Sequence, residues 1–189
     1  QLYLGFKPVM WSVVEKTALA EAEIEYHEKQ SKAIYVKFPV TSHEGNISVI
    51  IWTTTPWTIP CNKAIAFSKD LKYQVIEIGE DIDALSLKNG EKIILAEKLV
   101  STFCKTHSIN KVSVVSSLRT SELKDFVCEH PLKNLGYNFL VKLFEANHVT
   151  DEAGTGFVHI APNHGLEDFD VGKKNNLGNL TTVDESGIY

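Results

Sequence analysis

The sequence predicts a mainly β protein, a closed β-barrel with peripheral α-helices. Two observations support this fold class. Short apolar runs rich in β-branched residues recur along the 189-residue chain, and turn residues separate them. Few segments have the apolar spacing of a helix, so the regular alternation of strands and helices that is typical of a parallel α/β sheet is missing.

The first elements lie in the first forty residues. Residues 17–26 predict a short helix, because an Ala/Glu-rich run follows a threonine that can cap it. Residues 24–28 and 33–40 alternate between apolar and polar side chains on either side of a polar break. This pattern predicts a β-hairpin.

A nearly continuous apolar run at residues 46–55 ends in three threonines and predicts a buried strand. Pro56 and Pro60 have no N–H to donate to a ladder, so this strand should end near Thr55. Further strands are predicted at residues 63–67, 73–78, 111–117, 137–146 and 155–162. Helical segments are predicted at residues 91–107 and 165–176, and a helix or turn at residues 121–131.

Composition limits the possible classes of protein. With 43% hydrophobic residues the chain can bury one core, and its net charge of −5 argues against binding nucleic acid by charge alone. That charge still permits a small site for one nucleotide. Three cysteines without CxxC spacing indicate a reduced, cytoplasmic protein rather than a disulfide framework or a zinc knuckle. No apolar run reaches the length of a membrane span, so no membrane partner is expected.

The first candidate site is "WTTTPWTIPCN", residues 52–62. If Thr53, Thr54 and Thr55 are extended, they point alternately to two faces, so at least one hydroxyl faces inward. A buried hydroxyl needs a hydrogen-bond partner, which favours a site for a polar ligand. The alternative is a Thr-rich edge strand, since threonine favours strands. Trp52 and Trp57 are either core and rim aromatics or walls of a pocket.

The second candidate site is "GTGFVHIAPNHGLEDFDVG", residues 154–172. His159 is either a satisfied core residue or a functional one, and Asp168 either interacts with a helix dipole or binds a ligand. The spacing of His159, His164 and Asp168 matches no standard zinc pattern. Without a nucleophile elbow or a P-loop, an enzyme with this sequence is expected to lack a covalent nucleophile.

These two stretches, in this order, resemble the editing domain of the isoleucyl-tRNA synthetases, which is called connective polypeptide 1. The segments "GFKPVMWS", "TALAEAEIEY" and "SELKDFVCEHP" extend the resemblance over nearly the whole chain. Valyl and leucyl editing domains typically carry arginine where Thr55 stands. Glu167 and Phe169 depart from the commoner Asp and Tyr of the family. The resemblance implies that residues 1–189 are one editing domain cut from a larger synthetase, whose catalytic core lies beyond both termini.

The resemblance also implies an activity, the hydrolysis of mischarged Val-tRNA(Ile) at its terminal adenosine. A pocket for isoleucine rejects valine only weakly, a limit for which isoleucyl-tRNA synthetase is a standard example, so a second site must remove valine. The partner is then the acceptor end of tRNA(Ile), with valyl-adenylate as a further substrate to consider. The implied setting is a cytoplasmic monomer. No cofactor is implied for this segment, since ATP, Mg²⁺ and any Zn²⁺ belong to the missing parts.

Position by position, the resemblance assigns roles to the residues of both stretches. It gives catalytic roles to Thr53, Thr54 and Thr55, which contact the terminal ribose and order the attacking water. It also gives one to Asp168, which binds the α-ammonium group of the substrate. Among the other substrate-binding residues, Trp52 and Thr58 form walls of the side-chain pocket. Asn62 supports the site, and His159 excludes isoleucine. Two alternatives stay open, a non-catalytic module that binds the tRNA acceptor end and a metal-dependent hydrolase.

Overall fold

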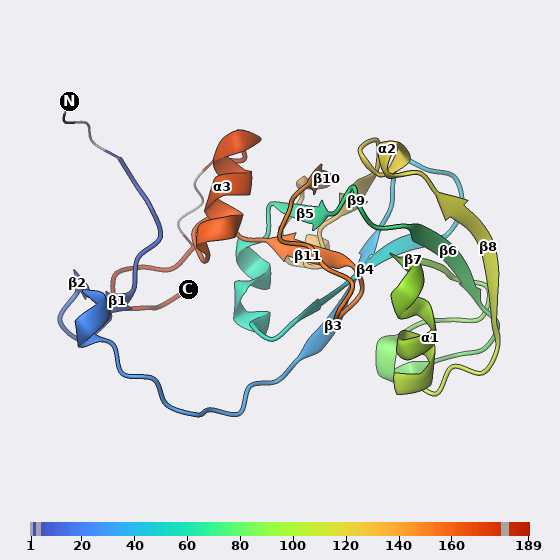
Figure 1. The fold of residues 1–189 in the computed structure, drawn as a ribbon, viewed down its shortest axis with the longest axis horizontal. Helices are drawn as coiled ribbons and strands as arrows, with labels where there is room; N and C mark the ends of the chain where they lie inside the picture. The colour runs from blue at the N-terminus through green and yellow to red at the C-terminus, as the bar shows by residue number, and fades with distance from the viewer. Residues whose placement is uncertain (1, 3–4, 179–181) are drawn as a thin grey trace.

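The computed structural model describes residues 2, 5–178 and 182–189. Its described residues form three sheets (Figure 1). The five-stranded sheet has the order β3 (Ile34–Pro39), β4 (Ile47–Thr53), β7 (Lys92–Ala96), β6 (Tyr73–Ile78) and β8 (Val112–Leu118). The four-stranded sheet has the order β11 (Phe157–Ile160), β5 (Ala64–Phe67), β10 (Leu140–Glu145) and β9 (Val127–Glu129). Strands β1 (Trp11–Ser12) and β2 (Thr17–Ala18) form a separate small hairpin.

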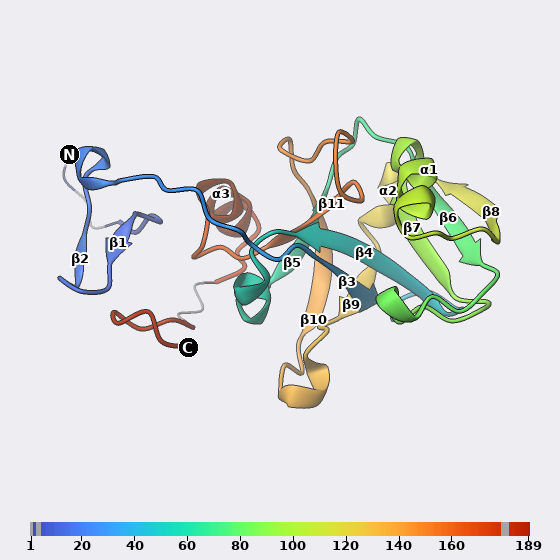
Figure 2. The same ribbon diagram turned by 90° about the horizontal axis from the view of Figure 1, so that it is seen from below.

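Helices occupy the connections between strands. The α-helices are α1 (Glu97–Thr106), α2 (Thr120–Leu123) and α3 (Leu166–Lys174). Four short 3₁₀ segments are present in the described residues: η1 (Glu21–Glu23), η2 (Pro56–Cys61), η3 (Asp83–Leu85) and η4 (Lys133–Leu135). In both views the β1–β2 hairpin and the C-terminal end lie at one end of the molecule, and α1 lies at the other (Figures 1 and 2).

The predicted closed β-barrel is wrong. Among the described residues both large sheets are open, and the fold is mixed α/β. The sheets are linked by one isolated bridge, Val40 to Cys128, while β8 pairs only with β6 and has exposed side chains along nearly its whole length. Closure would require a partner for that edge. In addition, β4 pairs parallel with β7 and β5 pairs parallel with β10, which strand periodicity does not reveal.

Two local predictions near the N-terminus are also wrong. Residues 17–26 contain the strand β2 and the 3₁₀ segment η1 instead of one helix. Residues 24–28 carry no strand, so β3 pairs antiparallel with β4, not with a hairpin partner before it. The other predicted strands are present, and the segment 91–107 divides into β7 and α1. The helix predicted at residues 165–176 is confirmed as α3.

Three apolar clusters hold these elements together. The largest packs side chains of both large sheets against one another, with Phe38, Phe67 and Tyr73 fully buried. A second cluster lies between the five-stranded sheet and α1, around Phe103. The third packs Val171 of α3 onto the four-stranded sheet. Strands β4, β5 and β11 thus come together at the centre of the molecule, where the candidate site lies. None of the described helices is both long and apolar enough to cross a membrane.

Candidate active site

The threonine stretch marks the point where β4 stops and η2 begins. Strand β4 ends at Thr53, two residues before the predicted limit. Thr55 has φ −121° and ψ 64°, outside the strand and helix regions, and Pro56 then begins the 3₁₀ segment. Proline suits this first position because its fixed φ matches a helix start and its missing N–H is not needed there. This sharp change of direction places side chains from successive residues close to one another.

Three threonine hydroxyls and one histidine form a continuous hydrogen-bonded chain. The Oγ1 atoms of Thr53 and Thr55 are 3.2 Å apart, and those of Thr55 and Thr58 are 3.3 Å apart. Thr58 Oγ1 is then 3.0 Å from Nε2 of His159, which is 101 residues away in the sequence. The chain therefore joins the two sequence stretches directly, at the end of β4 and the middle of β11.

The partners of this chain indicate where its protons lie. Thr58 Oγ1 lies 2.8 Å from the carbonyl oxygen of Thr55, which can only accept, so the single Thr58 proton is donated there. His159 must then donate from Nε2–H to Thr58, and we assign this tautomer to the ring. Nδ1 of His159 is consequently an unprotonated acceptor, and it is buried without a partner among the described residues.

Burial keeps the His159 ring neutral. The side chain is 6% exposed, and desolvation is the main cause that lowers its pKa to about 4, with His164 and His130 adding in the same direction. A neutral ring is an uncharged hydrogen-bond donor to Thr58 at neutral pH. It does not place a cation beside the site.

This lowered pKa predicts an acid-sensitive contribution to stability. Because the unfolded chain binds a proton at His159 near pH 6.5 and the folded chain only near pH 4, stability falls as pH drops through this window. We expect wild type to lose about 2 kcal/mol more between pH 7 and pH 5 than His159→Gln, measured by urea unfolding at both pH values. Equal losses in the two proteins would show that His159 is not the group responsible.

Asn62 is the buried residue that ends the threonine stretch. Its side chain is 0% exposed, its Nδ2 donates to the carbonyl oxygen of Ala64 at 2.8 Å, and its backbone N–H donates to that of Ile59 at 3.0 Å. Its Oδ1 is buried without a partner among the described residues. An unpaired buried carbonyl oxygen is costly to stability.

Asp168 lies in the first turn of α3 and is tied to the end of β11. Its Oδ2 accepts a hydrogen bond from the Ala161 backbone N–H at 2.8 Å, and no ion pair of the described residues includes it. Burial is the main cause that raises the pKa of Asp168, while the Ala161 N–H and the charge of His148 act in the opposite direction. A cationic ligand group would supply the countercharge that this carboxylate lacks.

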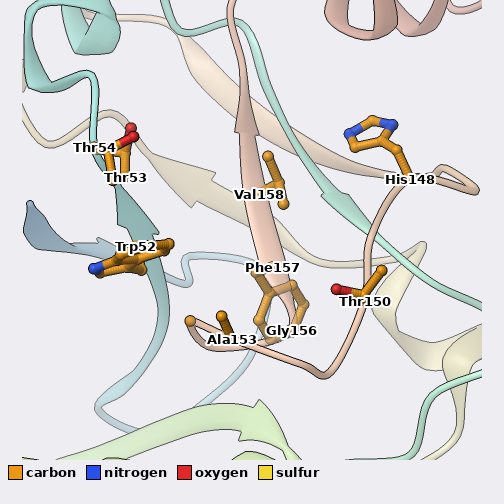
Figure 3. Close-up of a pocket in the computed structure, with 10 residues that line it drawn as sticks. Trp52, Thr53, Thr54, His148, Thr150, Ala153, Gly156, Phe157 and Val158 are labelled. Atoms are coloured by element: carbon orange, nitrogen blue, oxygen red, sulfur yellow. The ribbon is translucent and has the colours of Figure 1, made fainter. Parts of the chain in front are cut away.

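A pocket of about 290 Å³ opens beside the end of β4. Figure 3 shows Trp52, Thr53 and Thr54 on one side of it and His148 on the other, with the β11 residue Val158 between them. The remaining walls come from the loop before β11 and from its first residues (Thr150, Ala153, Gly154, Gly156 and Phe157). Trp52 packs close to Gly154, where an added Cβ would lie 3.4 Å from the indole.

The pocket and the hydroxyl chain take different residues of β11. Phe157 and Val158 line the pocket, whereas His159 does not line it and contacts Thr58. Thr53 belongs to both, since it lines the pocket and bonds Thr55. The site is therefore two adjoining parts that share one threonine.

Comparison with known proteins identifies the family. The curated relatives include the isoleucine–tRNA ligases of Agrobacterium fabrum, 51% identical over 174 residues and 90% of this chain, and of Pelagibacter ubique, 46% identical over 192 residues and all of it. The matches cover 18% and 21% of these relatives, so the chain spans about a fifth of their length. No family model matches the chain.

Solved structures identify the fold of this piece. The chain superposes on the Plasmodium knowlesi cytosolic leucyl-tRNA synthetase editing domain with a TM-score of 0.57 and 10% identity, over 79% of this chain and 66% of that one. The structure titled GlLeuRS-CP1 gives a TM-score of 0.60 and 14% identity, over 76% and 60%. Such low identities show the fold alone. The chain is similar to a segment of the isoleucine–tRNA ligases and has the fold of these editing domains.

Within this fold, the structure brings together some of the predicted residues and separates others. Hydrogen bonds join Thr53, Thr55, Thr58 and His159. Thr54 is exposed and lines the pocket without joining the chain, and Trp52 lies in the pocket, apart from Thr58. Asn62 and Asp168 lie outside this hydrogen-bonded chain. Asn62 is bonded to Ala64 of β5, and Asp168 lies in α3 and is bonded to Ala161.

Sequence reasoning missed several residues that shape the site. His148 and Thr150 line the pocket from a loop whose sequence shows no motif. Tyr73 was seen only as a strand residue, yet its hydroxyl donates to the Gly156 carbonyl at 2.8 Å and accepts from the Ser68 N–H at 3.0 Å. Burial raises the pKa of Tyr73 to about 12, so it remains a donor. Only the spacing of glycines around residue 155 gave any signal for this region.

The described residues also show no ready set of metal ligands. The described residues contain no group of three or more His, Cys, Asp or Glu side chains arranged to hold an ion. The three cysteines, Cys61, Cys104 and Cys128, are free and buried.

The hydroxyl chain predicts different results for different threonines. Valine preserves the shape and β-branching of threonine but removes the oxygen. We expect Thr53→Val and Thr58→Val to lower ester hydrolysis by about tenfold or more, because each removes a link of the chain, while Thr54→Val has a smaller effect. Single-turnover hydrolysis rates and melting temperatures of the three variants check this expectation. Full activity in all of them would leave threonine with a role in strand formation only.

Proposed function

We propose that this domain hydrolyses the aminoacyl ester of mischarged Val-tRNA(Ile), and so acts as an aminoacyl-tRNA deacylase in post-transfer editing. The observation that carries the proposal is the contact of Thr58 with His159, which joins the two stretches that the family resemblance assigns to the editing site. Relatives named isoleucine–tRNA ligase and structural neighbours named editing domains support the same reading. We place the activity in the cytoplasm, in a monomeric synthetase.

The proposed mechanism assigns each group a simple task. An aminoacyl ester is already activated, so an ordered water and a well-placed carbonyl suffice without a covalent nucleophile. Thr53 and Thr55 hold the water and the terminal ribose, because Thr53 lines the pocket and its hydroxyl lies 3.2 Å from that of Thr55. Asp168 binds the α-ammonium group of the amino acid, a charge-assisted contact that fixes the position of the ester.

The deciding experiment measures deacylation of Val-tRNA(Ile) and of Ile-tRNA(Ile) by the isolated domain at high concentration. Faster hydrolysis of the valyl ester supports the proposal. Binding of the acceptor end without hydrolysis would favour a passive recognition module instead. A chelator control separates the third reading, since activity that disappears in EDTA and returns with Zn²⁺ would contradict a metal-independent mechanism.

The specificity for valine is proposed to depend on His159. If its ring, together with Thr58, fills the space needed by the extra methylene of isoleucine, then His159→Ala should raise the ratio of isoleucyl to valyl hydrolysis. A ring is a good size limit because it has only two rotatable bonds and the strand fixes its root. The measurement is that ratio in wild type and variant. A ratio that does not rise would exclude size exclusion by His159, and equal losses of about 100-fold would indicate a general base.

A further inference from the structure

A second histidine, His130, is buried with a hydrogen-bond partner on each ring nitrogen, and it has no role in the proposed function. It follows β9 directly and is 1% exposed. Its ring stacks on that of Tyr137, with centroids 4.8 Å apart and planes 13° apart, and packs against Phe139 at 5.0 Å. This packing fixes the direction of both ring nitrogens.

Both nitrogens of His130 have backbone partners. The Leu132 N–H lies 3.1 Å from Nδ1, and because a backbone N–H can only donate, Nδ1 is the acceptor. Nε2 therefore carries the proton, and it lies 3.2 Å from the carbonyl oxygen of Ile59, which can only accept. Each of the two contacts by itself requires the tautomer with the proton on Nε2, so His130 donates to the Ile59 carbonyl oxygen.

Ile59 belongs to η2, a segment that lacks part of its own hydrogen bonding. A 3₁₀ turn uses i to i+3 bonds, but Pro60 has no N–H to donate to the Trp57 carbonyl, which accepts from the Tyr189 hydroxyl instead. The Ile59 carbonyl, in contrast, accepts from both the Asn62 N–H at 3.0 Å and His130. η2 is thus anchored from outside, at a residue that directly follows Thr58.

We propose that His130 is a positioning residue of the editing site. Its hydrogen bond to Ile59 fixes η2, and through it the Thr58 hydroxyl and the Asn62 side chain, from the residue that follows β9. The effect on activity rests on the proposed function, whereas the effect on η2 does not.

Two isosteric substitutions separate the two hydrogen bonds of His130. Asparagine retains an acceptor near the Nδ1 position for the Leu132 N–H but loses the donor to Ile59. Glutamine places an amide nitrogen near the Nε2 position and retains that donor. Both variants lose the aromatic ring, so they share the cost in packing. We expect single-turnover hydrolysis of the valyl ester to fall about tenfold or more in His130→Asn and less than about threefold in His130→Gln.

Amide hydrogen exchange of Asn62 gives a readout that does not depend on activity. We expect this exchange to be faster in His130→Asn than in His130→Gln, because only the first frees η2. His107→Asn is the control, since His107 also packs against aromatic rings but lies at the end of α1, away from η2. It should leave hydrolysis and Asn62 exchange unchanged.

Equal exchange in the two His130 variants would overturn the proposal, and so would hydrolysis losses that follow the melting temperature alone. If wild type does not hydrolyse the ester, the proposed function fails. The exchange comparison would still decide whether His130 holds η2.

Discussion

Replacing Asp168 with alanine is expected to lower hydrolysis of Val-tRNA(Ile) by at least about tenfold, measured as the single-turnover rate at saturating protein. A charge-assisted contact between a buried carboxylate and an ammonium group contributes roughly 1.5 to 3 kcal/mol, and about 1.4 kcal/mol corresponds to a tenfold change. The carboxylate is half-buried, has no ion-pair partner among the described residues and has a raised pKa caused by burial. A bound α-ammonium group would offset this desolvation, so removal of the Asp168 carboxylate should lower the rate of hydrolysis.

Two matched variants separate charge from structure. Asp168→Asn retains an oxygen that can accept from the Ala161 N–H, so it should fold normally and still lose activity. Asp170→Ala removes one negative charge from an exposed position of the same helix and should remain active. A large fall in melting temperature in Asp168→Ala, with hydrolysis nearly unchanged, would mean that Asp168 only stabilises the start of α3.

The largest effect on stability is expected for Gly156→Ala. Gly156 has φ +80°, a conformation in which alanine is strained by about 1 to 2 kcal/mol. An added Cβ would also lie 2.4 Å from the Cβ of Ala96, at the junction of β7 and α1. Because Ala96 is buried and is bonded through its N–H to the Thr155 carbonyl at 2.9 Å, it cannot move aside easily. Overpacking of this kind adds about 1 to 3 kcal/mol.

Gly90→Ala isolates the contribution of the backbone. Gly90 has φ +83°, but an added Cβ there would meet no atom within 4 Å. Urea unfolding of both variants should therefore show a loss at Gly90 from strain alone and a loss at Gly156 larger by about 2 kcal/mol. Similar losses would show that the contact with Ala96 adjusts at little cost. Because Gly156 lines the pocket, the variant should also lower hydrolysis.

Local pattern was sufficient to locate most strands. The apolar run of β4 and the proline that follows it are encoded in adjacent residues, and the strand ends within two residues of the predicted limit. The split of residues 91–107 into β7 and α1 was missed, because Ile93, Ile94 and Leu95 suit a buried strand and a helix equally. The Ala/Glu-rich run at residues 17–26 has high helix propensity, but without a packed apolar face it forms only the two-residue strand β2 and the 3₁₀ segment η1.

The sequence by itself indicated the family, through the order and content of two short stretches, and it named candidate site residues whose roles remain predictions. Tertiary structure alone decided that the sheets stay open, that β4 and β7 run parallel, and that Thr58 meets His159 while Trp52 faces a separate pocket. The contact of His130 with the Ile59 carbonyl was likewise decided by the tertiary structure. The physical reason is that periodicity specifies which face of a strand is buried, whereas pairing partners and contacts 70 to 100 residues apart depend on how the whole core packs.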